Sequence, residues 1–344
     1  MVRTKTPNVA GNPRVVEANE IQRLAANPMN LERFQSLFAN REVILGRVLD
    51  IAFLESTRFP YLEHFRVFGW LDFILLHRDI YIDAVRMCYS NASNAYHRNN
   101  FDDRFKSRVC GKSFEINRSL IHNLFGIPEG GLLYESWSFN VVEATQVVFE
   151  DESLTHFIDS TSHLSMMHRL LHLICVHILV PRKGNFSSVT KEDLWLMYNI
   201  ITRQRVDLCA IIVHEMIGVF SRKNRSLPYA MAISLILENK IDNLGNVRSV
   251  SIHKSQHINR GSLIRMGYKE DKEGHWAKSK KRKEVSDSSD EDEAPIPPSS
   301  FDIPSPTSPG PSQIPSSSHQ FEDIQALIHG MADLKSEVVA LRDR

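Results

Sequence analysis

The sequence predicts a mainly α-helical fold, a single helical domain that carries one or two small β-hairpins. Apolar residues recur at helical spacing through most of residues 30–277, and 42% of the 344 residues are hydrophobic, which suffices for a sizeable core. Only two short segments break this rhythm with alternating polar and apolar residues. The longest apolar stretch, Leu170–Val180, is about half as long as a bilayer span of about 20 residues, so we expect no membrane partner.

The helices of this body are predicted from their start and stop signals. In chain order, we expect Asn30 to cap a helix through Phe38, Pro60 to lead into a helix over Tyr61–Gly69, and Asp79 to begin a helix through Tyr89. Residues 161–180 are expected to form an apolar helix that Pro181 ends. Thr190 with Asp193 three residues later resembles a capping box, which begins a helix through Arg203, and residues 207–221 and Pro228–Lys240 supply two more helices.

The two alternating segments predict the hairpins. The first is Arg104–Ile116, with Gly111 at the turn, and Asn117 then caps a helix that runs through Phe125. The second is Met266–Lys278, which turns between Glu270 and Gly274.

Composition divides the chain into four parts. Residues 1–29 are predicted to be a flexible N-terminal arm, and residues 30–277 the helical body. Residues 284–319 hold 11 serines and 8 of the 15 prolines, so we expect a disordered linker over 278–319, first basic and then acidic. Residues 320–344 predict a short coiled-coil helix, because apolar residues over 324–341 alternate at spacings of three and four.

Charge and cysteine usage limit the class of protein. The 41 Lys and Arg balance the 41 Asp and Glu, which argues against a strongly basic, dedicated nucleic-acid binder. The four cysteines are isolated, which argues against a disulfide scaffold or a zinc ribbon and suits a reducing compartment.

The tail suggests a location and partners. A nuclear localisation signal is predicted at Lys278, Lys280, Lys281, Arg282 and Lys283, so we expect a nuclear protein, or otherwise a cytoplasmic one. Acidic residues follow Ser288 and Ser289, and prolines follow Ser305 and Ser308, so these four serines are candidate phosphorylation sites. Weak self-association or protein partners are expected through residues 324–341.

Two clusters in the body are candidate binding sites. A basic hairpin face could contact nucleic-acid phosphates, with solvated surface charge as the alternative; its residues are Arg104, Lys106, Arg108, Lys112 and Arg118. His168, His172 and Cys175 fall on one helix face and could bind zinc, with hydrogen-bonded core residues as the alternative.

Several of these features together resemble a known family. They are the run VCGKSFEINRSLIHNLFGIPEGG at 109–131, a Gly69-Trp70 helix end, a helix with Tyr81, a helix with Arg169 and His172 that ends at Pro181, and Leu227-Pro228. Over roughly residues 35–240 the chain resembles the putative plant transposon protein domain, which occurs in retrotransposon-derived, envelope-like plant proteins. It is more distantly similar to the plant mobile domain. The resemblance implies a plant protein that derives from a transposable element, with no catalytic residue or cofactor to carry over.

The residues themselves contain no motif of a transposase, reverse transcriptase or protease. Phe101-Asp102-Asp103 lacks the spacer of a reverse transcriptase, and Asp159-Ser160-Thr161 lacks the glycine of an aspartic protease. We therefore expect a non-enzymatic interaction or structural module with no cofactor and no small-molecule substrate. The alternative is a nucleic-acid-binding module that uses the hairpin face and the basic run at 278–283.

Overall fold

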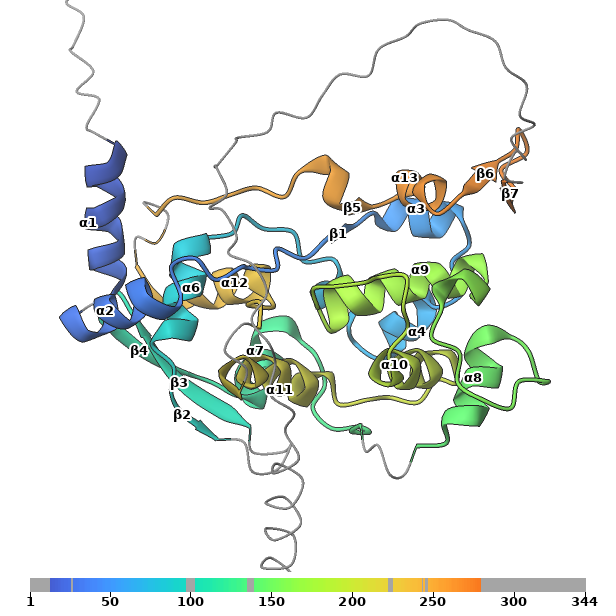
Figure 1. The fold of residues 1–344 in the computed structure, drawn as a ribbon, viewed down its shortest axis with the longest axis horizontal. Coiled ribbons are helices and arrows are strands. Elements are labelled where there is room, and N and C mark those ends of the chain that lie inside the picture. Colours follow the sequence, from blue (N-terminus) through green and yellow to red (C-terminus); the bar gives the residue numbers. More distant parts are fainter. Residues whose placement is uncertain are drawn as a thin grey trace, which may run out of the picture. The chain divides into compact units, whose positions relative to one another are not determined.

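Start and stop signals place most of the helices, and the computed structural model shows the resulting mainly α fold (Figure 1). It describes residues 13–25, 27–96, 103–134, 139–221, 225–242, 244 and 247–279. These residues form thirteen α-helices and three small β-sheets, and they belong to one compact unit that spans residues 1–281. None of the helices in these ranges is long and apolar enough to cross a membrane.

The N-terminal segment differs from the flexible arm that the sequence predicted. Residues Pro13–Ala25 instead form helix α1, whose last two residues are buried. Helix α2 (Pro28–Leu37) begins earlier than predicted, because Asn27 Oδ1 accepts a hydrogen bond from the Asn30 backbone N–H at 2.8 Å. Asn30 therefore lies inside the helix and does not cap it. A proline at the first helical position favours this earlier start.

Four short helices follow, of which the second and fourth were predicted: α3 (Ile51–Ser56), α4 (Leu62–Val67), α5 (Leu71–Ile74) and α6 (Ile82–Ser90). Their aromatic side chains pack into the core. Phe65 and Trp70 are fully buried, and their stacked ring centroids lie 6.3 Å apart. Burying one large apolar side chain stabilises a fold by about 1.5–3 kcal/mol, so this cluster is a substantial part of the core.

A three-stranded antiparallel sheet contains the first predicted hairpin. Its strand order is β2 (Ser93–Tyr96), β3 (Arg104–Val109) and β4 (Lys112–Ile116), and Cys110 and Gly111 make the turn with positive φ angles. Phe105 and Val109 are fully buried on the face that packs against α6 and against α11 (Leu208–Ser221). The charged residues of β3 lie on the opposite face, whereas Ser107 is buried on the inner face, where its hydroxyl donates to the Cys88 carbonyl oxygen at 2.7 Å.

Helix α7 (Arg118–Phe125) confirms the prediction for Asn117, whose Oδ1 accepts a hydrogen bond from the Leu120 N–H at 2.9 Å. Gly126 ends α7 with a φ of +68°. Helix α10 (Lys191–Ile201) confirms the capping box of Thr190 and Asp193. Helix α8 (Val141–Phe149), which the sequence did not predict, lies beside α10 (Figure 1).

The prediction of one continuous helix over residues 161–180 was wrong. The segment forms a 3-10 turn η1 (Thr161–His163), helix α9 (Met166–Ile174) and a π-helical turn η2 (Cys175–Leu179). Ser165 caps α9, because its Oγ accepts a hydrogen bond from the His168 N–H at 3.4 Å. A side-chain cap inside the segment starts a new helix there.

Helices α11 and α12 and the second hairpin follow the predictions closely, whereas α13 was not predicted. Helix α11 has Asp207 before its first turn, and α12 spans Ala230–Lys240. Strand β5 (His257–Ile258) pairs in parallel with β1 (Val48–Leu49), between η4 (Lys254–Gln256) and α13 (Arg260–Arg265). The second hairpin is confirmed as β6 (Tyr268–Glu270) and β7 (Trp276–Lys278).

Candidate functional site

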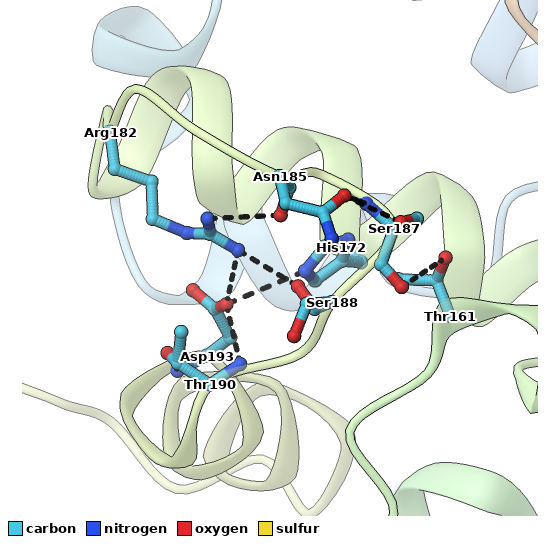
Figure 2. A network of polar contacts seen from close by, with 8 residues as sticks. All are labelled: Thr161, His172, Arg182, Asn185, Ser187, Ser188, Thr190 and Asp193. Carbon is cyan, nitrogen blue, oxygen red and sulfur yellow. Dashed lines mark hydrogen bonds and ion pairs between the residues drawn. The ribbon is translucent and has the colours of Figure 1, made fainter. Parts of the chain in front are cut away.

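A buried polar cluster lies where α9, η2 and the start of α10 meet (Figure 2). Its centre is Asp193, in the first turn of α10, which is 5% exposed. His172 comes from α9, and Arg182 follows η2. The capping box turns Asp193 inward, because its side chain must reach back to the backbone N–H of Thr190.

Asp193 has three partners. Its Oδ2 accepts hydrogen bonds from Arg182 Nη2 at 2.8 Å and from the Thr190 N–H at 2.9 Å, and His172 Nε2 lies 3.5 Å away. Burial alone would raise the pKa of Asp193, but the contacts with His172 and Thr190 and the charge of Arg182 lower it below its usual value. The carboxylate is therefore ionised and held by groups of the protein itself.

The same arginine holds the loop that joins η2 to α10. Arg182 donates to the carbonyl oxygens of Asn185 at 3.3 Å and Ser188 at 2.9 Å. Thr161 Oγ1 donates to the Ser187 carbonyl oxygen at 3.2 Å, which joins the loop to η1 (Figure 2). The cluster thus connects η1, α9, the start of α10 and the loop before it, and its chemistry is that of a structural network that holds these segments together.

The predicted metal ligands are not brought together. His168 Nδ1 lies 2.6 Å from the Val148 carbonyl oxygen, which only accepts, so Nδ1 donates and Nε2 accepts from the Tyr61 hydroxyl. His172 faces Asp193, and burial and Asp193 raise the pKa of the Cys175 thiol well above its usual value. In the described ranges, the His, Cys, Asp and Glu side chains whose ligand atoms all lie within 4.8 Å of one another are Asp271, Glu273 and His275.

That exposed trio belongs to the turn of the second hairpin. Asp271 Oδ1 accepts hydrogen bonds from the backbone N–H groups of Glu273 at 2.9 Å and His275 at 2.8 Å, which shape the turn. The alternating Asp-x-Glu-x-His spacing is visible in the sequence, but these three residues were not among the predicted metal ligands.

The outer face of the β2–β3–β4 sheet carries three of the five predicted basic residues. Arg104, Lys106 and Arg108 alternate with buried residues and are exposed. Glu115 lies opposite Lys106 and adds one acidic residue to the same face. We call this surface the outer sheet face.

The other two basic residues lie elsewhere. Lys112 lies opposite Val109, so it belongs to the other side of the sheet, and its Nζ is 3.7 Å from Asp242. Arg118 forms an ion pair with Asp207, whose side chain is fully buried. The assignment of Lys112 and Arg118 to the outer sheet face was therefore wrong. The alternation along β3 does not continue through the turn, so Lys112 lies on the other face. Arg118 begins helix α7, and its side chain contacts Asp207.

A second buried carboxylate was also missed. Asp103 is 2% exposed, and its Oδ2 lies 2.9 Å from His214 Nδ1 on α11. The hydrogen bond with Asp103 raises the pKa of His214. The two residues are 111 positions apart, so no local pattern could have found the pair.

Of the predicted tail features, the structure places only the first residue. Lys278 is the exposed last residue of β7. The remaining residues of the localisation signal, the four candidate phosphorylation sites and the 324–341 segment lie outside the described residues.

Comparison with known proteins identifies the part of the chain that contains this cluster and the outer sheet face. A family model described as a putative plant retrotransposon-related domain matches residues 66–240, which is just over half of the chain. The match agrees with the resemblance seen in the sequence, although it begins later than residue 35. No curated protein and no solved structure matches the chain.

Proposed function

Because the chain belongs to the putative plant retrotransposon-related domain family, we propose that its folded body is a non-catalytic interaction module of transposable-element origin. The observation that supports this proposal is the state of Asp193. This carboxylate is 5% exposed, and its Oδ2 is already engaged by Arg182 and Thr190. A catalytic carboxylate must reach a substrate, whereas this one joins a loop to a helix. The body then acts through the surface it presents.

The test uses the purified full-length chain. Partners cross-linked to it in plant nuclei are purified and titrated against it, and we expect direct binding with a Kd of about 1 μM or tighter. Asp193→Asn should lower the free energy of unfolding without reducing any substrate turnover by the chain. Glu192→Gln, a change at the exposed neighbouring acid, should change neither the free energy of unfolding nor turnover. A chain that turns over a substrate, and loses that activity in Asp193→Asn at unchanged stability, would overturn the proposal.

The tail supplies a location and a means of self-association. We propose that the basic run from Lys278 to Lys283 directs the protein to the nucleus. A fluorescent fusion should move to the cytoplasm when this run is neutralised; an unchanged distribution would contradict the signal. Leu334→Pro should reduce concentration-dependent sedimentation of the full chain if 324–341 pairs with a second copy.

A second candidate function, nucleic-acid binding, is favoured by the outer sheet face. Alternate residues of a strand repeat every ~6.6 Å, so Arg104, Lys106 and Arg108 form a straight row of cations. Such a row can neutralise successive phosphates of an extended strand, and the released counterions make binding weaken with salt.

Fluorescence anisotropy with a single-stranded oligonucleotide tests this candidate. Changing all three residues of the row to serine should lower the magnitude of the slope of log K against log salt by about 2, since each phosphate contact contributes about 0.7. The matched control removes Lys269 and Lys272 from the second hairpin and should leave the slope unchanged. Equal slopes for the wild type and the triple variant would exclude the outer sheet face.

A further inference from the structure

Strand β4 is an open edge of the three-stranded sheet, in which β3 lies between β2 and β4 (Figure 1). The pairing of β4 with β3 is regular from the turn to its far end, at Phe105 and Ile116. The other edge strand, β2, pairs irregularly, with a register shift between its two ends. Irregular pairing is one way in which proteins protect a sheet edge, and β4 lacks this protection.

The backbone groups of Ser113 and Glu115 point away from β3. In an antiparallel pair, residues bonded to the neighbouring strand alternate with residues whose N–H and C=O groups point outward. A two-residue turn closes this hairpin, so the even-numbered residues of β4 bond to β3 and the odd-numbered ones point outward. Arg108, opposite Ser113, agrees with this order, because its carbonyl oxygen accepts a hydrogen bond from Asn91 Nδ2 at 2.6 Å instead of bonding to β4.

These outward groups are available to another strand. Among the residues that the structure describes, no hydrogen-bond partner meets the backbone N–H or C=O of Ser113 and Glu115. Ser113 is exposed and Glu115 is half-exposed, whereas Phe114 between them is 9% exposed on the inner face. The edge therefore offers two donors and two acceptors in a fixed, extended arrangement, which is what strand addition requires.

We propose that β4 pairs with β4 of a second copy of this chain, antiparallel and centred on Phe114, so that one sheet continues across both copies. In this register Ser113 of each copy lies opposite Glu115 of the other, and both outward N–H groups and both outward C=O groups of each strand are paired. Centring on Glu115 would place two like charges directly opposite each other. Centring on Ser113 would pair Glu115 with Gly111, which has a φ of +76° and is not extended.

The side chains and charges suit a second copy. On the outer sheet face, the Ser113 hydroxyl of one copy can donate to the Glu115 carboxylate of the other. On the inner face, the two Phe114 rings meet at a non-hydrogen-bonded pair, where opposite side chains are closest. The cation rows of the two copies are three strand spacings apart, about 14 Å, which exceeds the screening length of about 8 Å. This pairing goes beyond the proposed interaction function and does not involve residues 324–341.

Amide exchange of the full-length chain tests the pairing without any substitution. A small strand-to-strand interface predicts a dimer Kd of about 10–100 μM. At a chain concentration of ten times this Kd, about four-fifths of the chains are paired, so exchange at Ser113 and Glu115 should slow about fivefold relative to dilute chain. Exchange at Lys272, an exposed residue of the second hairpin, is the control and should not change.

Two results of this measurement would overturn the proposal. One is unchanged exchange at Ser113 and Glu115 up to about 1 mM chain. The other is slower exchange at these amides only after a different protein is added, which would assign the edge to a strand of that protein.

Two substitutions at one position separate this pairing from association through 324–341. Both are made in the Leu334→Pro chain, in which the tail segment cannot pair as a helix. Ser113→Pro removes an outward N–H that does not bond to β3, so it should weaken dimerisation in sedimentation by about tenfold or more while urea unfolding shows a folded chain. Ser113→Thr keeps the N–H, is the matched control, and should dimerise as before. Equal dimerisation of the two variants, or no dimerisation once Leu334→Pro is present, would overturn the proposal.

Discussion

Replacing Asp207 with alanine tests whether long-range polar pairs hold this fold together. The side chain of Asp207 is fully buried. Its Oδ1 accepts a hydrogen bond from the Ala210 N–H at 2.9 Å, which caps α11, and its Oδ2 accepts one from the Gly130 N–H at 3.1 Å. Its Oδ2 also forms the ion pair with Arg118, at the start of α7. One carboxylate therefore joins two helices and a loop.

The expected cost follows from these contacts. Loss of a helix cap costs about 1 kcal/mol, and removal of one partner of a buried ion pair costs about 3–5 kcal/mol, because the other charge is left uncompensated. The side chain of Arg118 is 17% exposed and can partly turn to water, so the two costs do not simply add. We expect Asp207→Ala to lower the free energy of unfolding by about 3–5 kcal/mol, out of the 5–15 kcal/mol typical of a domain.

Urea unfolding of the full-length chain, followed by circular dichroism, measures this change. Asp242→Ala is the matched control: its carboxylate is 89% exposed and 3.7 Å from Lys112, so its loss should cost less than about 1 kcal/mol. Once Arg118→Ala has removed the stranded charge, Asp207→Ala should cost clearly less than in the wild type. A cost below about 1 kcal/mol for Asp207→Ala alone would refute the reasoning.

Three further predictions follow from single sites. The pKa of His214 is raised in the folded protein, so its hydrogen bond to Asp103 stabilises the fold fully below pH ~6.5, and this stabilisation is lost as the pH rises through the folded-state pKa. The Tm should therefore fall more between pH 6 and 8 in the wild type than in His214→Gln. Equal falls in Tm would contradict this prediction. Gly131→Ala should lower the free energy of unfolding more than Gly184→Ala. Both positions have positive φ, but only at Gly131 would a Cβ lie 2.6 Å from a backbone oxygen. Urea unfolding measures both changes, and an equal loss of free energy in the two variants would refute the steric argument. Cys110, the partly exposed thiol, should react first with a thiol reagent, and Cys110→Ser should remove the fast phase; a retained fast phase would be inconsistent with burial protecting the other three cysteines.

Local signals predicted the elements that depend on neighbouring residues. Asn117 and Thr190 cap helices where expected, because a cap bonds to backbone groups two or three positions away. The cap of α2 was predicted at Asn30, but Asn27 caps the helix and Pro28 is its first residue. The predicted helix over 161–180 is interrupted at Ser165, which caps α9, because apolar periodicity alone does not reveal an internal cap.

The candidate site was less predictable than the fold. The Asp193 capping box was visible in the sequence, but its partners Arg182 and His172 reach it from the loop and from α9. A small cavity between residues 44–46 and the first turn of α12 could not be inferred at all, because the two segments that line it are far apart in the sequence. Sequence spacing grouped His168, His172 and Cys175, and packing gave each of them a different environment.

The sequence by itself determined the mainly α class, both hairpins and the outward row of Arg104, Lys106 and Arg108, because periods of 3.6 and 2 residues are properties of the local chain. Tertiary structure alone decided which charges became buried and paired. Arg118 meets Asp207 across 89 positions, and Asp103 meets His214 across 111. A charge enters the interior only where a partner is already positioned to compensate its lost hydration, and that position depends on how the whole body packs.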